Sequence, residues 1–457
     1  MPREVVDSAS GLGVVILAAG QGTRMRSRLP KVLHRIAGQP MVQYVLDALS
    51  GWVDTKPILV VGHGADQVQS ALGEVVIYAL QQPQLGTGHA VLQARSALEG
   101  QCDTVLVLYA DMPLLSSDTL RSLVGLHRAQ SEPVTMLTCV REDSMGFGRI
   151  LRDSAGLVTA IVEEAQATPA QLAIRELNPG VYCFNSRWLW DHLPRLPLSP
   201  KGEYYLTHLV GLAVSEGHIV QGIAVADATE TFGINTRVHL SHAENIVRQR
   251  IREALMLSGV TLLDPDSTYV ETGVTVGRDT TIYPNTHLQG RTHIGEECHI
   301  GPNSIIRDST IGHRCRLLAS VVEEAQLEDD VSVGPFAHLR KDAYLASGVH
   351  MGNFGEIKNS RLGPGTKMGH FSYVGDAQIA ADVNIGAGTI TCNFDGAQKQ
   401  TTIIEEGAFI GSDTMLVAPV RIGKRARTGA GSVVTRDVPP GSVVYGVPAR
   451  PKKTAGQ

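Results

Sequence analysis

The chain contains no long run of apolar residues and no excess of basic charge. The only early apolar run, Val14–Ala19, is far shorter than the roughly 20 apolar residues of a membrane-spanning helix. No basic segment with a long apolar core stands at the N-terminus. The formal net charge is −5 at pH 7, and charged residues make up 19% of the chain. We therefore expect neither a membrane protein nor a basic surface that binds nucleic acid.

Paired cysteines are also missing. The six cysteines lie far apart, and no two of them form a CxxC motif. Isolated cysteines of this kind are typical of reduced thiols, so the sequence predicts a cytoplasmic protein. With 457 residues the chain is too long for a single hydrophobic core, and we expect two or more domains.

The second half of the chain has a period of six residues. Aliphatic residues recur at every sixth position, often followed by glycine, whereas an α-helix has a period of 3.6 and a strand a period of 2. Hexapeptide repeats predict a parallel β-helix, in which each aliphatic side chain points inward and stacks on its equivalent one coil away. Three phased runs argue against chance in a valine-rich chain, and slips near Ile311, Leu362 and Ile379 indicate shortened corners. The runs are Val270, Val276, Ile282, Leu288, Ile294, Ile300 and Ile306; Val333, Leu339, Leu345, Met351 and Ile357; and Ile404, Ile410, Leu416, Ile422, Thr428 and Val434.

An apolar strand followed by a glycine loop opens the first half. Val14–Ala19 leads to Gly20 and Gly22, and the cations Arg24 and Lys31 follow. Glycines let backbone N–H groups reach phosphate oxygens, and the cations balance the phosphate charge. The GxxxxGK[ST] motif of a P-loop is absent, and so is the third glycine of a dinucleotide fingerprint. The pattern indicates a loop that binds a nucleoside triphosphate.

Strands alternate with helical segments through the rest of this half. Apolar runs at Lys56–Gly62 and Thr104–Tyr109 predict strands, and Gly86 begins a second tight loop. The alternation predicts an α/β domain with a mixed, largely parallel sheet, whose ligands lie beyond the carboxyl ends of the strands. Asp111 falls at such an end, so we favour a Mg²⁺ ligand there over a helix cap before Pro113.

A motif LAAGxGTRM followed by PK is more specific than these features, and with it the sequence resembles the sugar-nucleotide nucleotidyltransferases. The turn at Gly146–Ile150, the carboxylate Glu163, the turn at Asn178–Tyr182 and the hexapeptide repeats extend the likeness over essentially the whole chain. The chain thus resembles the bifunctional enzymes that acetylate glucosamine 1-phosphate with acetyl-CoA and then uridylylate the product with UTP.

The resemblance implies an architecture and an assembly. A Rossmann-like nucleotidyltransferase domain would occupy residues 1–235, and a linker helix residues 236–258. A left-handed parallel β-helix with a C-terminal tail would occupy residues 259–457. The family further implies Mg²⁺, small-molecule substrates, a homotrimer with acetyl-transfer sites between subunits, and a place in UDP-N-acetylglucosamine synthesis. The helix itself is predicted from one apolar face, Val247, Ile251 and Leu255, and from Gly259 at its end.

Site roles in the first domain follow from the same resemblance. Arg24 and Lys31 would act on the phosphates, and Asp111 and Asn235 would hold Mg²⁺. Two positions depart from the family pattern, Ala110 for glycine and Pro179 for threonine. The implied positions for uridine and its phosphates are Leu17, Ala18, Ala19, Gly20, Gln81, Gly86, Thr87 and Tyr109, and those for the N-acetylglucosamine ring are Gly148, Glu163 and Asn178.

Three places interrupt the plain repeat of the second half. A lone histidine is more often structural than catalytic, but His370 is near Tyr373, Asn384 and several cations, which favours a general base. Thr391–Thr402 is predicted to be an insertion on the binding face. The resemblance implies Arg340, Lys358, Tyr373 and Asn384 for the sugar phosphate, and Ala387, Asn393, Phe394, Ser412 and Ala430 for acetyl-CoA.

The C-terminus departs from the family. Gly446 stands where the best-known branch has an arginine that binds the CoA nucleotide, and a glycine has no side chain to do so. We expect Arg450 to contact the CoA phosphates instead; the alternative is a solvated arginine in a tail with Lys452 and Lys453. Two rival functions stay open: a single-activity nucleotide-sugar pyrophosphorylase with an oligomerising β-helix, and a non-catalytic scaffold or sensor.

Overall fold

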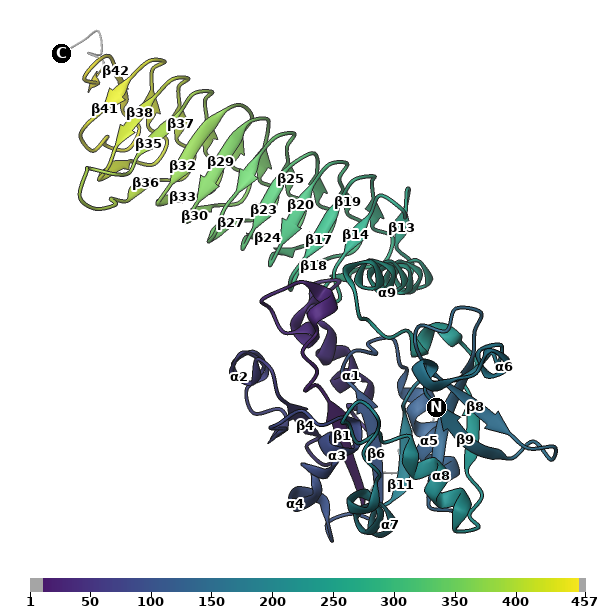
Figure 1. The fold of residues 1–457 in the computed structure, drawn as a ribbon. Helices are drawn as coiled ribbons and strands as arrows, with labels where there is room; N and C mark the ends of the chain where they lie inside the picture. The colour runs from purple at the N-terminus through teal and green to yellow at the C-terminus, as the bar shows by residue number, and fades with distance from the viewer. Residues whose placement is uncertain (1–10, 452–457) are drawn as a thin grey trace. The chain divides into compact units, whose positions relative to one another are not determined.

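The computed structural model of the protein describes residues 11–451. Two compact units make up the chain, Met1–Val247 and Arg248–Gln457, and helix α9 (Arg237–Leu257) contains the point of division (Figure 1). The expected helix is present, and the division falls inside it; a separate linker at 236–258 stays a prediction. Lys452 and Lys453 lie outside the described residues. Across residues 11–451 no helix is long and apolar enough to span a membrane.

One mixed sheet forms the centre of the first unit. In space its strands follow the order β5-β4-β1-β6-β11-β7-β10-β8-β9, with β12 paired to β7. The stretch from β5 to β6 is parallel, whereas β11, β10, β8 and β9 are antiparallel to their neighbours. The sheet is therefore mixed, as predicted. The strands are β1 (Leu12–Leu17), β4 (Ile58–Val61), β5 (Ile77–Leu80), β6 (Thr104–Tyr109), β7 (Val134–Val140), β8 (Gly148–Arg152), β9 (Val158–Val162), β10 (Glu176–Asn178), β11 (Tyr182–Asn185) and β12 (Gln221–Ala224).

Helices cover both faces of this sheet, and β1 shows why. Its successive side chains point to opposite faces, so Val14 and Ile16 belong to one buried core and Val15 and Leu17 to the other. Each fully buried aliphatic side chain contributes about 1.5–3 kcal/mol, which holds the strand ends in place. The first core includes residues of α1 (Met41–Leu49), α2 (Ala65–Leu72) and α5 (Ser117–Arg128), and the second includes residues of α3 (Thr87–Leu92), α7 (Ser186–His192) and α8 (His208–Ser215).

The second unit is a parallel β-helix made of three sheets of short strands. Within residues 11–451 these sheets contain 12, 10 and 9 strands. The strands β16 (Thr281–Ile282), β19 (His299–Ile300) and β22 (Arg316–Leu317) pair in register, which places their second residues in one inward column. Every residue of the three hexad runs is buried except Val276, which is partly exposed. The predicted ladder is confirmed.

The register slips are confirmed as sides of five residues. Ile311, Leu362 and Ile379 each follow the preceding inward residue by five positions, and all three are buried. They lie in β21 (Thr310–Ile311), β30 (Ser360–Leu362) and β33 (Ala377–Ile379), which pair in parallel like the other strands of their sheet. A shortened side therefore leaves the inward stack intact.

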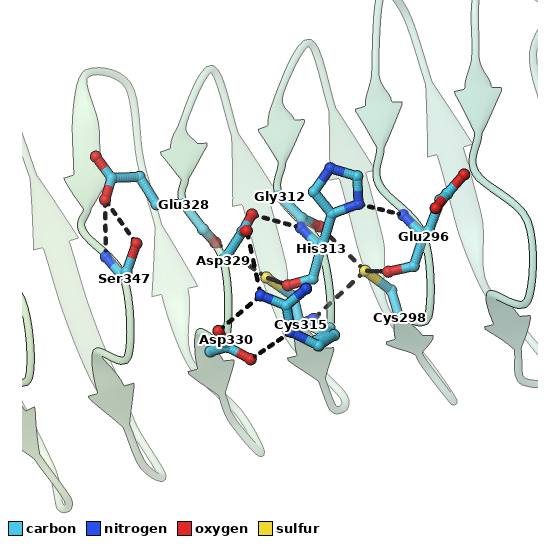
Figure 2. Close-up of polar contacts among 10 residues, drawn as sticks. Glu296, Cys298, Gly312, His313, Cys315, Glu328, Asp329, Asp330 and Ser347 are labelled. Carbon is cyan, nitrogen blue, oxygen red and sulfur yellow. Dashed lines mark hydrogen bonds and ion pairs between the residues drawn. The ribbon is translucent and has the colours of Figure 1, made fainter.

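Side chains at one corner of the β-helix bond to the backbone of the neighbouring coil (Figure 2). His313 Nδ1 accepts from the backbone N–H of Glu296 at 3.1 Å, and an Asp329 carboxylate oxygen accepts from the N–H of His313 at 2.9 Å. Inside the same coils Cys298 and Cys315 are fully buried, and each thiol donates to a carbonyl of the next coil at 3.1 Å. Coils are thus joined at their corners as well as along their strands.

The predicted insertion is shorter than expected. Residues Thr391–Thr402 were predicted to lie outside the repeat, but β35 (Ile390–Cys392) pairs with β38 (Met415–Val417), and β36 begins at Thr402. The loop therefore spans 393–401. The physical reason is that Thr391 occupies an inward position, where its hydroxyl bonds to the backbone N–H and C=O of Gly375 at 2.8 and 3.0 Å.

The last described residues also form a strand. β43 (Arg450–Pro451) folds back antiparallel to β42 (Val443–Tyr445), and Arg450 lies opposite Tyr445. Arg450 is exposed, but its backbone belongs to the end of the β-helix rather than to a free tail.

Candidate active sites

A cleft of about 1040 Å³ opens at the carboxyl ends of β1 and β6. It lies entirely within the first unit, and segments from Leu17 to Asn235 contribute to it. Arg24 is the one residue expected at this site that is absent from the lining. The expected residues that line the cleft are Leu17, Ala18, Ala19, Gly20, Lys31, Gln81, Gly86, Thr87, Tyr109, Asp111, Gly148, Glu163, Asn178 and Asn235.

Two oxygen-bearing side chains face one cation on the cleft wall. The Lys31 ammonium forms an ion pair with Asp111 and lies 3.3 Å from the amide oxygen of Asn235. Arg24 reaches the site indirectly, because it donates to the same amide oxygen at 3.0 Å. The backbone N–H of Ile234 donates to the Asp111 carbonyl at 3.0 Å. This bond holds the side chains of Asp111 and Asn235 next to each other.

This donor set fits Mg²⁺. Carboxylate and amide oxygens are ligands that Mg²⁺ accepts, and Mg²⁺ usually needs only one or two protein ligands besides phosphates and water. Here the Asp111 and Asn235 oxygens already converge on a positive charge, that of Lys31. Within residues 11–451, no group of three or more His, Cys, Asp or Glu side chains offers an alternative metal site.

Close backbone packing shapes the part of the cleft around Gly86. A Cβ on Gly86, whose φ is +96°, would lie 2.7 Å from the carbonyl oxygen of Tyr204, so only glycine fits there. The Gln81 amide donates to the Gly86 carbonyl at 2.9 Å, and the Thr87 hydroxyl accepts from the backbone N–H of Leu206 at 3.0 Å. These contacts fix the loop before α3.

Polar side chains also line the cleft near Tyr109. Glu163 accepts from the Thr207 hydroxyl at 2.9 Å, and the amide oxygen of Asn178 accepts from the Gly180 N–H at 3.0 Å. A Cβ on Gly180 would collide with the ring of Tyr109. Burial raises the pKa of Tyr109 far above its ordinary value, and the nearby Asp111 charge adds to the rise. Tyr109 therefore stays protonated and neutral.

A cluster of cations lies on the surface of the β-helix. The neighbouring charge of Lys399 lowers the pKa of Lys358, and Arg340 adds to the effect. Arg340 forms an ion pair with Glu356 at 2.8 Å and lies near Tyr373. This crowding of positive charge suits an anion such as a phosphate. Lys399 was missed from the sequence, although a lysine within the predicted insertion was the available signal.

The loop at 393–401 closes over the same surface. Asn393 donates to Asp376, which also accepts from Asn359 at 2.6 Å. A Cβ on Gly375 would lie 2.8 Å from the Asn393 amide nitrogen and would also strike the Tyr373 hydroxyl. The glycine thus allows Tyr373 and Asn393 to meet beside the cations, while Phe394 is exposed.

The remaining acetyl-transfer candidates form a column along one corner of the coils. The residues that follow Ser412 and Ala430 in the chain bond to the preceding coil: the N–H of Asp413 donates to the carbonyl of Ala387 at 2.6 Å, and the N–H of Gly431 donates to the carbonyl of Ser412 at 2.8 Å. At His370 the pattern shifts by one residue, because the N–H of Gly388 donates to the carbonyl of Phe371 at 2.6 Å. The strand register nevertheless places His370, Ala387, Ser412 and Ala430 at equivalent positions, each two residues after an inward residue of the same sheet. Tyr445 packs on Gly429 and brings Arg450 to the end of this column.

Two candidates are less enclosed. His370 is exposed, and it has no hydrogen-bond or ion-pair partner within the part of the chain that the structure describes. Asn384, in β34 (Asn384–Ile385), is half-buried on a different sheet from Tyr373 in β32 (Ser372–Gly375). His370 and Asn384 are therefore more open to solvent than Asn178 and Gln81, which are buried in the wall of the cleft.

Comparisons with known proteins match both halves. Residues 14–210 match the MobA-like NTP transferase domain, and residues 273–308 and 401–436 match the bacterial transferase hexapeptide (six repeats). The chain is 51% identical over 430 residues to the bifunctional protein GlmU of Heliobacterium modesticaldum, covering 94% of each chain. It is 46% identical to that of Brevibacillus brevis, covering 94% of each chain, and 47% identical to that of Pelobacter propionicus, covering 94% of this chain and 95% of the relative.

Proposed function

The chain belongs to the family of bifunctional GlmU proteins, and from that premise we propose which of its residues carry each of the two activities. It is a bifunctional transferase of UDP-N-acetylglucosamine synthesis. The left-handed β-helix transfers acetyl from acetyl-CoA to glucosamine 1-phosphate. The first unit then transfers UMP from UTP to N-acetylglucosamine 1-phosphate and releases pyrophosphate.

Uridylyl transfer needs positioning and charge stabilisation rather than a covalent intermediate. The sugar phosphate attacks the α-phosphorus of UTP, and the cleft holds the two groups in line. Lys31 and Arg24 stabilise the phosphate charge that spreads in the transition state. Asp111 and Asn235 would hold Mg²⁺, which supplies additional positive charge to the phosphates. The observation that supports this assignment most is the convergence of both oxygens on the Lys31 ammonium.

Acetyl transfer needs a base, because an ammonium group is not a nucleophile. We assign that role to His370, since histidine ordinarily titrates near neutral pH. Arg340, Lys358, Tyr373 and Asn384 bind the sugar phosphate. Acetyl-CoA lies along the corner column, where the small side chains of Ala387, Ser412 and Ala430 leave room, with Asn393, Phe394 and Arg450 beside it.

A homotrimer completes the second site in this proposal. The acetyl-transfer candidates lie on an open surface of one chain, so a neighbouring copy is needed to exclude water. The unpaired state of Cys102, Cys139, Cys183, Cys298, Cys315 and Cys392 supports a cytoplasmic location. Sedimentation tests the assembly: a fragment that begins near Thr236 should be oligomeric and one that ends near Arg252 should not. A monomeric C-terminal fragment would refute it.

One incubation tests the whole function. Glucosamine 1-phosphate, acetyl-CoA, UTP and Mg²⁺ should yield UDP-N-acetylglucosamine, identified by mass. Two partial incubations separate the rivals. A single-activity pyrophosphorylase would use N-acetylglucosamine 1-phosphate and UTP but would not acetylate glucosamine 1-phosphate, and a scaffold would do neither.

A further inference from the structure

A buried tyrosine hydroxyl lies behind the sugar end of the cleft. Tyr182, the first residue of β11, is 1% exposed, and within residues 11–451 its hydroxyl has no hydrogen-bond partner. Most buried polar side-chain atoms in proteins have a partner, so an exception calls for an explanation. Tyr182 is absent from the cleft lining and from every role assigned above.

The polar groups that surround this hydroxyl belong to the cleft. Tyr109 and Glu163 act on it electrostatically, whereas the Asn178 amide lies close enough to bond to the hydroxyl, and all three residues line the cleft. The Tyr182 ring is fixed behind them, because it stacks on Phe184 with centroids 5.5 Å apart. Burial raises the pKa of Tyr182 well above its ordinary value, so the hydroxyl keeps its proton and remains a donor.

Asn178 has an acceptor position to spare. The amide oxygen of Asn178 accepts the N–H of Gly180 at 3.0 Å, and a carbonyl oxygen of this kind can accept two hydrogen bonds. The Glu163 carboxylate, which accepts from Thr207, also has acceptor positions to spare, but it acts on Tyr182 through its charge, whereas Asn178 is close enough for a hydrogen bond. A second donor on the Asn178 oxygen would hold the amide in one orientation, with its NH₂ group available to a ligand in the cleft.

We propose that Tyr182 is a positioning residue for the sugar substrate: its hydroxyl donates to the amide oxygen of Asn178 in the loaded cleft and thereby presents the Asn178 NH₂ group to the N-acetylglucosamine ring. This inference rests on the proposed uridylyl transfer. Tyr182 acts through Asn178 and does not touch the reacting atoms.

The substitution Tyr182→Phe removes only the hydroxyl. We expect the KM for N-acetylglucosamine 1-phosphate to rise about 2- to 10-fold, the effect of one net hydrogen bond. The KM for UTP and the acetyl-transfer rate should not change. Tyr78→Phe is the matched control, because the Tyr78 hydroxyl on β5 donates to the Gly73 carbonyl at 2.7 Å and Tyr78 does not line the cleft. It should leave both KM values unchanged.

A double-mutant cycle with Asn178→Ala tests the route of action. If Tyr182 acts through Asn178, the Tyr182→Phe change should add nothing to the KM of the Asn178→Ala variant. Full additivity, or an equal rise in both KM values of the single variant, would overturn the proposal. So would an unchanged KM for N-acetylglucosamine 1-phosphate, whatever the melting temperature, because the hydroxyl would then have no effect on sugar binding. A wild-type enzyme without uridylyl transfer would instead refute the proposed function.

Discussion

The cleft of the first unit and the corner column of the β-helix are built in opposite ways. The cleft gathers strand ends and loops from Leu17 to Asn235 around one enclosed volume. The column places one residue per coil along a line, and its general-base candidate His370 is exposed. A twisted sheet brings distant segments to one edge, whereas a coil of a solenoid contacts only its neighbours.

The difference bears on assembly. A site at a sheet edge can be complete within one chain, because the loops after several strands surround it. A row of side chains on a β-helix has one open side, and water there would weaken the electrostatic contacts to a phosphorylated substrate. We therefore expect uridylyl transfer to be independent of oligomer state and acetyl transfer to depend on it.

Removal of the base should have the largest effect and should separate the two sites. His370→Ala should lower the acetyl-transfer kcat by about 10²–10⁴, the usual contribution of general-base catalysis. Uridylyl transfer by the same preparation should be unchanged. Both rates are measured by coupled assays on the intact chain. A normal acetylation rate at pH 7 would exclude this role for His370.

A substitution in the cleft should have the opposite selectivity to His370→Ala. Asp111→Asn should lower uridylyl transfer by about 10²–10³, the size of a lost transition-state electrostatic contact, and should leave acetyl transfer nearly intact. Uridylyl transfer in the wild-type enzyme should also stop when a chelator removes Mg²⁺. Loss of both activities by a variant that still folds would contradict the division into two independent sites.

A larger side chain at Gly375 should impair the acetyl-transfer site and leave the cleft of the first unit unaffected. Gly375→Ala places a methyl group against the Tyr373 hydroxyl and the Asn393 amide. Overpacking of this kind costs about 1–3 kcal/mol, so we expect the KM for glucosamine 1-phosphate to rise about 10-fold. Uridylyl transfer serves as the internal control. An unchanged KM would mean that Tyr373 and Asn393 do not need to meet over Gly375.

The smallest expected effect is at the end of the column. Arg450→Ala should raise the KM for acetyl-CoA about threefold, because one exposed contact to a phosphate is lost. The kcat should be unchanged. If the KM rises for acetyl-CoA but not for its 3′-dephospho analogue, Arg450 contacts the 3′-phosphate. An unchanged KM for acetyl-CoA would refute the contact.

Most of the β-helix could be predicted because nearly every inward position of the repeat is occupied by an apolar residue. The column of Ile282, Ile300 and Leu317 needs only one apolar residue at the same place in each coil. Thr391 breaks the apolar rule, since its hydroxyl is satisfied by Gly375 on the coil next to it. A sequence pattern does not contain that pairing, and for this reason the start of the loop was misplaced.

The candidate sites divide in the same way. The residues near Gly20 and Asp111 belong to short motifs that follow strands, so their meeting at one sheet edge could be predicted. Lys399 acquires its role from a loop that folds back toward Lys358. Tyr182 looks like an ordinary strand residue until the structure places its hydroxyl beside Asn178. Contacts of this kind depend on how the chain folds in three dimensions, so the spacing of residues along the chain does not predict them.

The register of the coils constrains how a chain of this design can change its length. Ile282 and Ile300 hold equivalent places, so gain or loss of one whole coil leaves every other side chain on its own face. A single added residue is absorbed only at a corner or in a loop such as 393–401. The β-helix can therefore grow or shrink in increments of one strand spacing, about 4.8 Å.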